Sequence, residues 1–305
     1  MARLAAIASL AGVASQAPPE KKTQPLACTG TDDPALQLVT IPDAWEFHTL
    51  DAVSGDRSVL WRHSKADNAE VKSITSCGIG AKDRMAYCII QHVETWCLAR
   101  VDGDGFAFVA RTPPGGKSGG GTCDEEGAFL AVMADRIWRL ADIDTLVGAS
   151  KPWDDMPQME DFAGVSPEHG KDLVVWAGWL VSISNEPMVV MTDLADSSLA
   201  TQTPSREGGD ELPKATFGTA YMQGGDMYFL ANVALGLFRL ELNPAAGSYT
   251  ATRVGESFLS TQTDGLYCVF PTVDPSSDGV IKDVSARAAM PTALALIGIV
   301  GTMLA

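Results

Sequence analysis

The sequence predicts an all-β protein, a single β-propeller of about five blades that is closed by its C-terminal strand. Three observations favour this fold. Short runs rich in aromatic and β-branched residues recur along the chain, they lack the helical period, and equivalent positions recur every ~40–50 residues. An irregular β-sandwich or barrel is the alternative, and six or seven blades also fit the spacing.

The predicted strands follow one another in a regular order. A first apolar run, bounded by turn-forming residues, recurs at 85–90, 127–133, 172–176, 226–230 and 265–270. A second run follows each of the first four, at 95–101, 137–141, 187–194 and 237–242. A third strand is clearest at 106–111, after Gly103-Asp104-Gly105, and at 249–254, after the loop 243–248.

Five positions mark the period, with spacings of 51, 39, 53 and 47 residues: Thr49, Arg100, Arg139, Thr192 and Arg239. The chain enters in the middle of a unit, with strands at 47–52 and 57–62, and leaves with the lone strand 265–270. We therefore expect this last strand to complete the first blade and close the ring. The segment 36–41 is an alternative for the missing strand.

The best-preserved repeat lies between residues 217 and 268, in the segments Phe217-Gly218-Thr219-Ala220, Gly225-Asp226-Met227-Tyr228-Phe229, Gly236-Leu237-Phe238-Arg239-Leu240 and Asp264-Gly265-Leu266-Tyr267-Cys268, with Asn232 between them. This stretch resembles the last repeat of a family of secreted, uncharacterised β-propeller-like domains. The resemblance implies the fold and an exported location, and it brings no catalytic residues.

The N-terminal end carries a targeting signal. Arg3, the uncharged stretch 4–14 and the small residues after it predict a secretory signal peptide, cleaved after Ala14 or Ala17. A buried N-terminal helix is the alternative. The expected organisation is a signal peptide (1–17), a disordered spacer (18–27), the β-propeller domain (28–272), a polar linker (273–287) and a hydrophobic tail (288–305).

The tail predicts a membrane anchor. Segment 288–305 has no charge, and it follows the polar spacer 280–287 and a cluster of small residues. This is the pattern of a glycosylphosphatidylinositol (GPI) attachment signal, with Ser277 as the lipid attachment site and Ser276 as the second choice. A single transmembrane helix or a packed C-terminal helix are the alternatives. We expect an extracellular protein on the outer face of the plasma membrane.

Charge limits the partners. The formal net charge of −16 argues against nucleic acid and anionic lipid surfaces, because both would repel the protein. The expected partner is an extracellular protein or glycan, besides the membrane that the C-terminal anchor would reach.

Six cysteines in an oxidising compartment predict disulfides. Ring closure would bring Cys28 to Cys268. A hairpin that turns at His92-Val93 would place Cys88 opposite Cys97, and Cys77 would then pair with Cys123 by elimination.

No motif predicts catalysis, a metal or a cofactor. Ser118 sits in a G-x-S-x-G match without the required strand and helix, so a flexible glycine loop is favoured. Asp102-Gly103-Asp104-Gly105 resembles the start of a calcium loop, but Pro113 replaces the closing acid, and a tight turn is favoured. Acidic pairs at 154–155 and 160–161 are expected on a solvated surface.

Aromatic residues could line a sugar-binding face, although packing between blades is the favoured role: Trp96, Trp138, Trp176, Trp179 and Phe238. The sequence thus favours a binding or display protein of unknown ligand on a propeller scaffold. The alternative is an extracellular glycan-acting hydrolase with carboxylates in the central channel.

Overall fold

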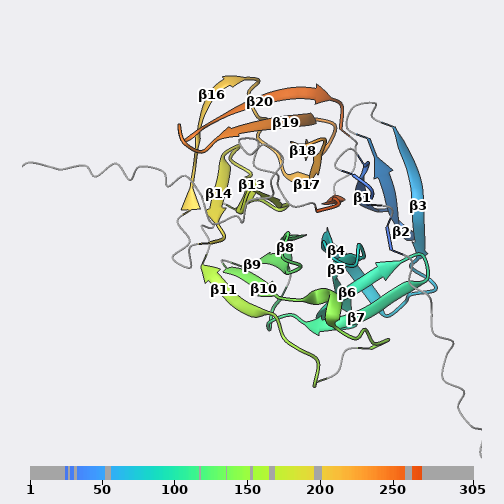
Figure 1. The fold of residues 1–305 in the computed structure, drawn as a ribbon. Coiled ribbons are helices and arrows are strands. Elements are labelled where there is room, and N and C mark those ends of the chain that lie inside the picture. The colour runs from blue at the N-terminus through green and yellow to red at the C-terminus, as the bar shows by residue number, and fades with distance from the viewer. Residues whose placement is uncertain are drawn as a thin grey trace, which may run out of the picture.

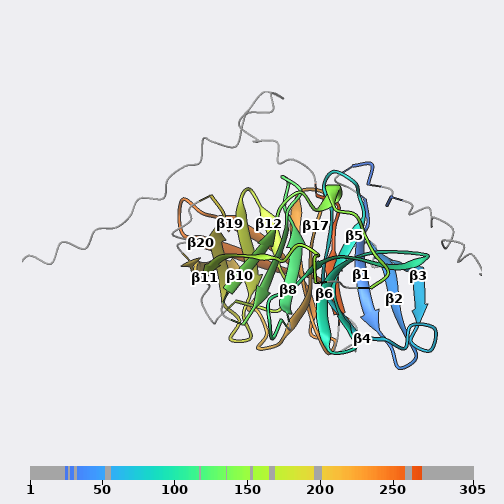
Figure 2. The ribbon, with the colours of Figure 1, turned by 90° about the horizontal axis from the view of Figure 1, so that it is seen from below.

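The computed structural model describes residues 25–269, apart from residues 27, 31–32, 52–55, 117, 135, 152–153, 165–168, 196–200 and 258–262. Five β-sheets surround a central axis like the blades of a propeller (Figure 1), and the blades stand next to one another in the side view (Figure 2). Four sheets have four strands, and the fifth carries an additional parallel strand at its outer edge. The expected all-β, five-bladed arrangement is confirmed.

The blades follow one another along the chain, and within each blade the strands are ordered from the innermost outward. Blade one contains β21 (Thr263–Leu266), β1 (Ala35–Thr40), β2 (Ala44–Leu50) and β3 (Arg57–Ser64). Blade two contains β4 (Val71–Ile79), β5 (Ala86–His92), β6 (Thr95–Asp102) and β7 (Gly105–Arg111). Blade three contains β8 (Ser118–Cys123), β9 (Phe129–Met133), β10 (Arg136–Leu140) and β11 (Glu160–Gly164), with a short 3-10 helix at Ile143–Thr145.

The last two blades complete the ring. Blade four contains β12 (Val174–Trp176), β13 (Trp179–Ile183), β14 (Val189–Asp193) and β15 (Thr201–Gln202). Blade five contains β17 (Phe217–Gln223), β18 (Asp226–Ala231), β19 (Gly236–Asn243) and β20 (Ser248–Gly255), and β16 (Ser205–Gly209) runs parallel to β20 at its edge.

The C-terminal strand closes the ring as predicted. β21 pairs antiparallel with β1, in a register that sets Leu36 opposite Leu266 and Val39 opposite Thr263. The segment 36–41, which the sequence left as an alternative, is the second strand of the same blade. Both segments are therefore part of blade one, because a four-stranded blade has room for each of them.

The five positions that marked the period are structurally equivalent. Each lies on the third strand of its blade, on β2, β6, β10, β14 and β19: Thr49, Arg100, Arg139, Thr192 and Arg239. Three of the first runs cover second strands, whereas 172–176 and 265–270 cover the innermost strands β12 and β21. In blade four the second strand, β13, had been missed. The phase of the repeat was therefore set by the third strands.

The innermost strand of blade three, β8, escaped prediction because glycine replaces the usual strand residues there. β8 has the sequence Ser-Gly-Gly-Gly-Thr-Cys, and it is a strand rather than the flexible loop that we expected. A Cβ atom on Gly121 would lie 2.7 Å from the carbonyl oxygen of Ser76 on β4. A Cβ on Gly265 of β21 would meet the backbone of Ala220 on β17. Glycine thus lets neighbouring innermost strands approach backbone to backbone.

This close approach leads to a testable prediction for Gly121 on β8. Gly121→Ala should lower the free energy of unfolding by about 2 kcal/mol or more, because the methyl group overlaps backbone that cannot move aside. Gly119→Ala in the same strand is the matched control, since its nearest neighbour would be 3.6 Å away. Urea denaturation followed by circular dichroism measures both. Equal stability of the two variants would show that the strands are not packed this tightly.

The structure contains two disulfides. Cys28 is joined to Cys268, the pair that ring closure predicted. Cys77 is joined to Cys88, which lies directly opposite it across β4 and β5 with a Cα–Cα distance of 4.1 Å. The expected pairs Cys88–Cys97 and Cys77–Cys123 are therefore wrong. Cys97 and Cys123 are buried free thiols, and burial raises the pKa of both.

The position of one turn explains the error. The β5–β6 hairpin turns at Val93-Glu94, so that His92 pairs with Thr95 and Cys97 stands opposite Ile90. A turn one residue earlier would have paired Cys88 with Cys97. A shift of one residue at the turn therefore moves the partner of every residue by two.

Val93 also carries backbone strain, because its φ is 54° in the left-handed region that β-branched residues avoid. The side chain is 45% exposed, so its loss costs little burial. Val93→Asn should therefore raise the free energy of unfolding by about 1 kcal/mol. A thermal melt of the variant beside wild type measures this gain, and a lower melting temperature would contradict it.

Several predicted segments lie outside the described residues. These are the signal peptide 1–17, most of the spacer 18–27, the linker 273–287, Ser277 and the tail 288–305. Within the described part of the chain, no helix is long and apolar enough to cross a membrane.

Candidate functional site

Two buried aspartates lie at the centre of the propeller. Asp172, which precedes β12, accepts hydrogen bonds from the backbone N–H groups of Ala220 on β17 (2.7 Å) and Gly265 on β21 (2.9 Å). Asp264 on β21 accepts one from the N–H of Ser76 on β4 (2.9 Å). The two carboxyl groups therefore link four of the five innermost strands.

Tyr267 connects the fifth innermost strand, β8. The hydroxyl of Thr122 on β8 donates a hydrogen bond to the Tyr267 hydroxyl (3.3 Å), and the N–H of Val175 on β12 donates another (2.8 Å). The polar groups at the centre are thus arranged around the axis as links between strands. Their structural role is to hold the five innermost strands together around the axis.

These aspartates do not have the arrangement that a hydrolase requires. Burial raises the pKa of Asp172 well above its ordinary value, and the charge of Asp264 raises it further. Burial likewise raises the pKa of Asp264 to about 7. A glycosidase needs two carboxyl groups that face a substrate, with room for a sugar between them. Asp172 is 1% exposed and Asp264 is 8% exposed, with backbone packed around them.

The acidic pairs singled out in the sequence lie elsewhere. Asp154, Asp155, Glu160 and Asp161 are exposed residues of blade three, and Asp161 forms an ion pair with Arg136 (2.5 Å). Ser118 begins β8, without the helix that a nucleophile elbow needs, and its side chain lies outside the described residues.

A serine and a histidine do meet in blade four. His169 lies 2.7 Å from the Ser182 hydroxyl through Nδ1 and 2.9 Å from the Thr192 hydroxyl through Nε2. Both hydroxyl-bearing residues are fully buried, and burial lowers the pKa of His169 to about 4. The imidazole is therefore a neutral hydrogen-bonding group of the core, and Ser182 is not accessible to a substrate.

A pocket of about 540 Å³ lies between blades one and two, at the end of the propeller where β4, β6 and β21 terminate. Its walls come from the N-terminal segment, the outer strands of blade one, the end of β4, the β6–β7 turn and the end of β21: Pro25, Leu26, Asp33, Pro34, Leu36, Thr49, Leu60, Trp61, Ile79, Asp102, Gly103, Asp104 and Cys268. Its size is that of a small-ligand site.

The β6–β7 turn forms one wall. Asp102 accepts a hydrogen bond from the Asp104 N–H through Oδ1 (2.8 Å), which holds the turn in shape. A Cβ on Gly103 would be 3.2 Å from Trp61, so the turn packs against the indole. The segment that resembles the start of a calcium loop is therefore the tight turn that the sequence favoured, and it lies beside an aromatic ring.

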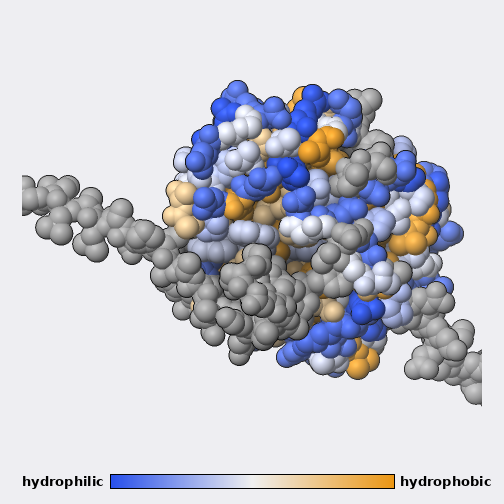
Figure 3. Space-filling model, turned by 45° about the horizontal axis from the view of Figure 1, so that its top comes forward, coloured by the Kyte–Doolittle hydropathy of each residue, from blue (hydrophilic) through white to orange (hydrophobic). Residues whose placement is uncertain are grey.

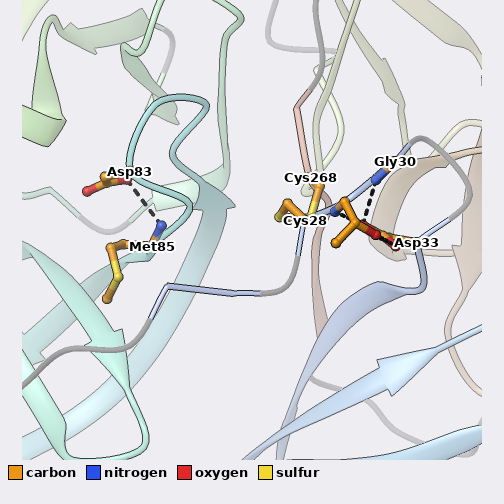
Figure 4. The surroundings of a disulfide bond; sticks show 7 residues. Cys28, Gly30, Asp33, Asp83, Met85 and Cys268 are labelled. Atoms are coloured by element: carbon orange, nitrogen blue, oxygen red, sulfur yellow. Dashed lines mark hydrogen bonds between the residues drawn. A yellow bond between two sulfur atoms is a disulfide. The ribbon is translucent and has the colours of Figure 1, made fainter.

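The N-terminal segment forms another wall, next to the Cys28–Cys268 disulfide (Figure 4). The Asp33 carboxylate accepts hydrogen bonds from the N–H of Gly30 (3.0 Å), the N–H of Thr29 and the Thr29 hydroxyl (2.9 Å). Although partial burial opposes it, these bonds and the charge of Arg84 bring the pKa of Asp33 below its ordinary value. The segment is thus fixed by the disulfide at Cys28 and by the hydrogen bonds of Asp33.

Sequence reasoning missed the aromatic residue of this pocket. Trp96, Trp138, Trp176 and Trp179 are partly buried and pack against the apolar core, and Phe238 is buried within it, as the packing interpretation expected. Trp61 belongs to β3, which also exposes Val59 and Leu60. The signal available in the sequence was the uninterrupted apolar run at 59–61 within the predicted strand 57–62.

The coloured surface on the face in Figure 3 is largely hydrophilic, and its apolar residues form small separate groups. Among the described residues, no group of three or more His, Cys, Asp or Glu side chains could hold a metal ion. The pocket is therefore the candidate binding site.

No family model matches the sequence, and no curated protein matches it, so the family resemblance is not confirmed. Solved structures resemble the fold. A chain of a nidogen–laminin complex is 12% identical with a TM-score of 0.40, covering 72% of this chain and 99% of that chain. A gluconolactonase from Xanthomonas campestris is 11% identical with a TM-score of 0.43, covering 78% and 80%. A Bacteroides caccae protein of unknown function is 9% identical with a TM-score of 0.42, covering 76% and 98%.

Proposed function

We propose that this protein is an extracellular binding protein, tethered to the outer face of the plasma membrane, that captures its ligand in the pocket between blades one and two. The observation that carries the proposal is the contrast between two places in the fold. At the centre, innermost strands pack backbone to backbone and the aspartates accept backbone hydrogen bonds, whereas the pocket at the side combines an aromatic ring, apolar walls and carboxylates. Such a mixture suits recognition.

Two features support the location. The disulfides Cys28–Cys268 and Cys77–Cys88 indicate an oxidising, extracellular environment. The net charge of −16 keeps the surface solvated and self-repelling, as a displayed protein requires.

The pocket is tested by screening peptides and oligosaccharides against the full chain in a mild detergent, with 5-fluorotryptophan in place of tryptophan. Ligands should shift the fluorine resonance of Trp61, which the Trp61→Phe variant identifies. Trp61→Ala should abolish their binding. Trp138→Ala is the matched control, because Trp138 is also partly buried but lies on blade three. Ligands that bind Trp61→Ala as well as wild type would contradict the proposal.

The tether is tested on intact cells. A phosphatidylinositol-specific phospholipase should release the protein, and Ser277 should carry the lipid, because the small residues around it and the uncharged tail 288–305 form the attachment signal. Recovery of peptides from residues 288–305 in the mature protein would contradict the anchor.

A further inference from the structure

The pocket is acidic. Asp33, Asp102 and Asp104 are among its lining residues, and none of the lining residues that the structure describes is Lys, Arg or His. Carboxylates set into a concave wall with apolar neighbours concentrate negative potential there. A cationic ligand would therefore be attracted, and the net charge of −16 would add to its attraction.

The carboxylates are held in place before any ligand arrives. Asp102 is 6% exposed, and its hydrogen bond from the Asp104 N–H fixes its orientation. Asp33 is fixed by the donors of Thr29 and Gly30. Asp104 projects from the same turn and is exposed at the pocket. Such preorganisation reduces the entropy that binding would cost.

Trp61 supplies a flat surface next to these carboxylates. Its indole packs on Phe47, with ring centroids 5.5 Å apart, and its edge touches the turn at Gly103. The ring is half-buried and lines the pocket. A planar cation can lie against an indole while its N–H groups reach carboxylates at the edge of the ring.

We propose that the pocket binds the guanidinium group of an arginine side chain presented by a partner polypeptide. This inference rests on the proposed binding function and names its ligand. Guanidinium fits better than ammonium, because it stacks on the aromatic ring and offers paired donors to carboxylates. A sugar fits less well, since the polar lining is mostly acceptors and a sugar needs donors as well.

The test uses three short peptides, acetyl-Gly-X-Gly-amide, with X as arginine, lysine or citrulline. Citrulline has the shape of arginine without its charge. Binding to the full chain in detergent is measured from the Trp61 fluorine resonance at low salt. The arginine peptide should bind with a Kd in about the millimolar range, since one side chain buries little surface. The lysine peptide should bind more weakly, and citrulline should not bind.

Charge-removing variants complete the test. Asp104→Asn should weaken arginine binding by about tenfold. Asp102→Asn should also weaken it, while the amide oxygen still accepts the Asp104 N–H. Glu94→Gln, in the exposed β5–β6 turn, is the control and should bind as wild type does. Added salt should weaken binding in wild type and in the control.

Two outcomes would overturn the inference and can be told apart. If citrulline binds as well as arginine, or if the asparagine variants bind like wild type, the pocket does not recognise a cation. Neutral ligands that shift the Trp61 resonance would then leave the proposed binding function standing. If no peptide or oligosaccharide shifts that resonance, both the inference and the proposed function fail.

Discussion

Replacing Cys28 and Cys268 together with serine should lower the free energy of unfolding by about 4 kcal/mol. The bond closes a loop with a sequence separation of 240 residues, so it restricts the unfolded chain more than a short loop would. It also fixes the end of β21, a four-residue strand that joins the two ends of the ring. The loss of stability should therefore appear first in blade one.

The Cys77→Ser, Cys88→Ser variant is the matched control. Its disulfide has a sequence separation of 11 residues, and it joins two strands that are already paired. The expected loss is smaller, about 3 kcal/mol or less. Amide hydrogen exchange distinguishes the two variants, because β21 and β1 should exchange faster only when Cys28 and Cys268 are replaced. Unchanged exchange in these strands would show that their pairing closes the ring without the disulfide.

Much of the fold could be predicted from the sequence because the outer strands keep a strand-like composition. Runs such as 95–101 and 237–242 are apolar and lie close to the observed β6 and β19. Ring closure followed from the phase of these runs alone. The innermost strand β8 could not be predicted in this way, since it depends on glycines that serve contacts with β4, more than forty residues earlier in the chain.

The site was harder to predict than the fold. The turn at Asp102-Gly103-Asp104 was recognised, but its role depends on Trp61, which approaches it from another blade. Disulfide pairing depended on one turn, because placing it at His92-Val93 instead of Val93-Glu94 selects a different partner for Cys88. Contacts between blades and the exact register of a hairpin are properties of the folded chain that short runs do not encode.

The buried aspartates at the centre predict an unusual dependence of stability on pH. Burial raises the pKa of Asp264 from its ordinary 3.8 to about 7, whereas in the unfolded chain the group ionises near its ordinary value. Its protonated form is therefore favoured by folding. This contribution is complete below about pH 4 and is lost as the pH rises toward 7, and it amounts to a few kcal/mol. Asp172, whose pKa is also raised by burial and by Asp264, extends the loss to higher pH.

The contribution of His169 to stability changes with pH in the opposite direction. The pH dependence of wild-type stability alone therefore does not test the effect of Asp264. Burial lowers the pKa of His169 to about 4, and the neutral imidazole stabilises the fold above the ordinary value of 6.5. Its contribution falls as the pH drops from 6.5 toward 4. The change of wild-type stability between pH 4 and 7 is the balance of these two effects, to which the acidic surface adds repulsion at higher pH.

Asp264→Asn separates the effects, because the amide oxygen still accepts the hydrogen bond from the Ser76 N–H while the charge is removed. The stability of this variant relative to wild type should rise by a few kcal/mol between pH 4.5 and 8, since only wild type must then ionise the buried carboxyl group at position 264. Urea denaturation at intervals of half a pH unit measures the difference. Asp67→Asn is the control, because it removes a carboxyl group from an exposed position instead of from the centre. A difference for Asp264→Asn that does not change with pH would mean that the Asp264 carboxyl group titrates alike in the folded and unfolded chains.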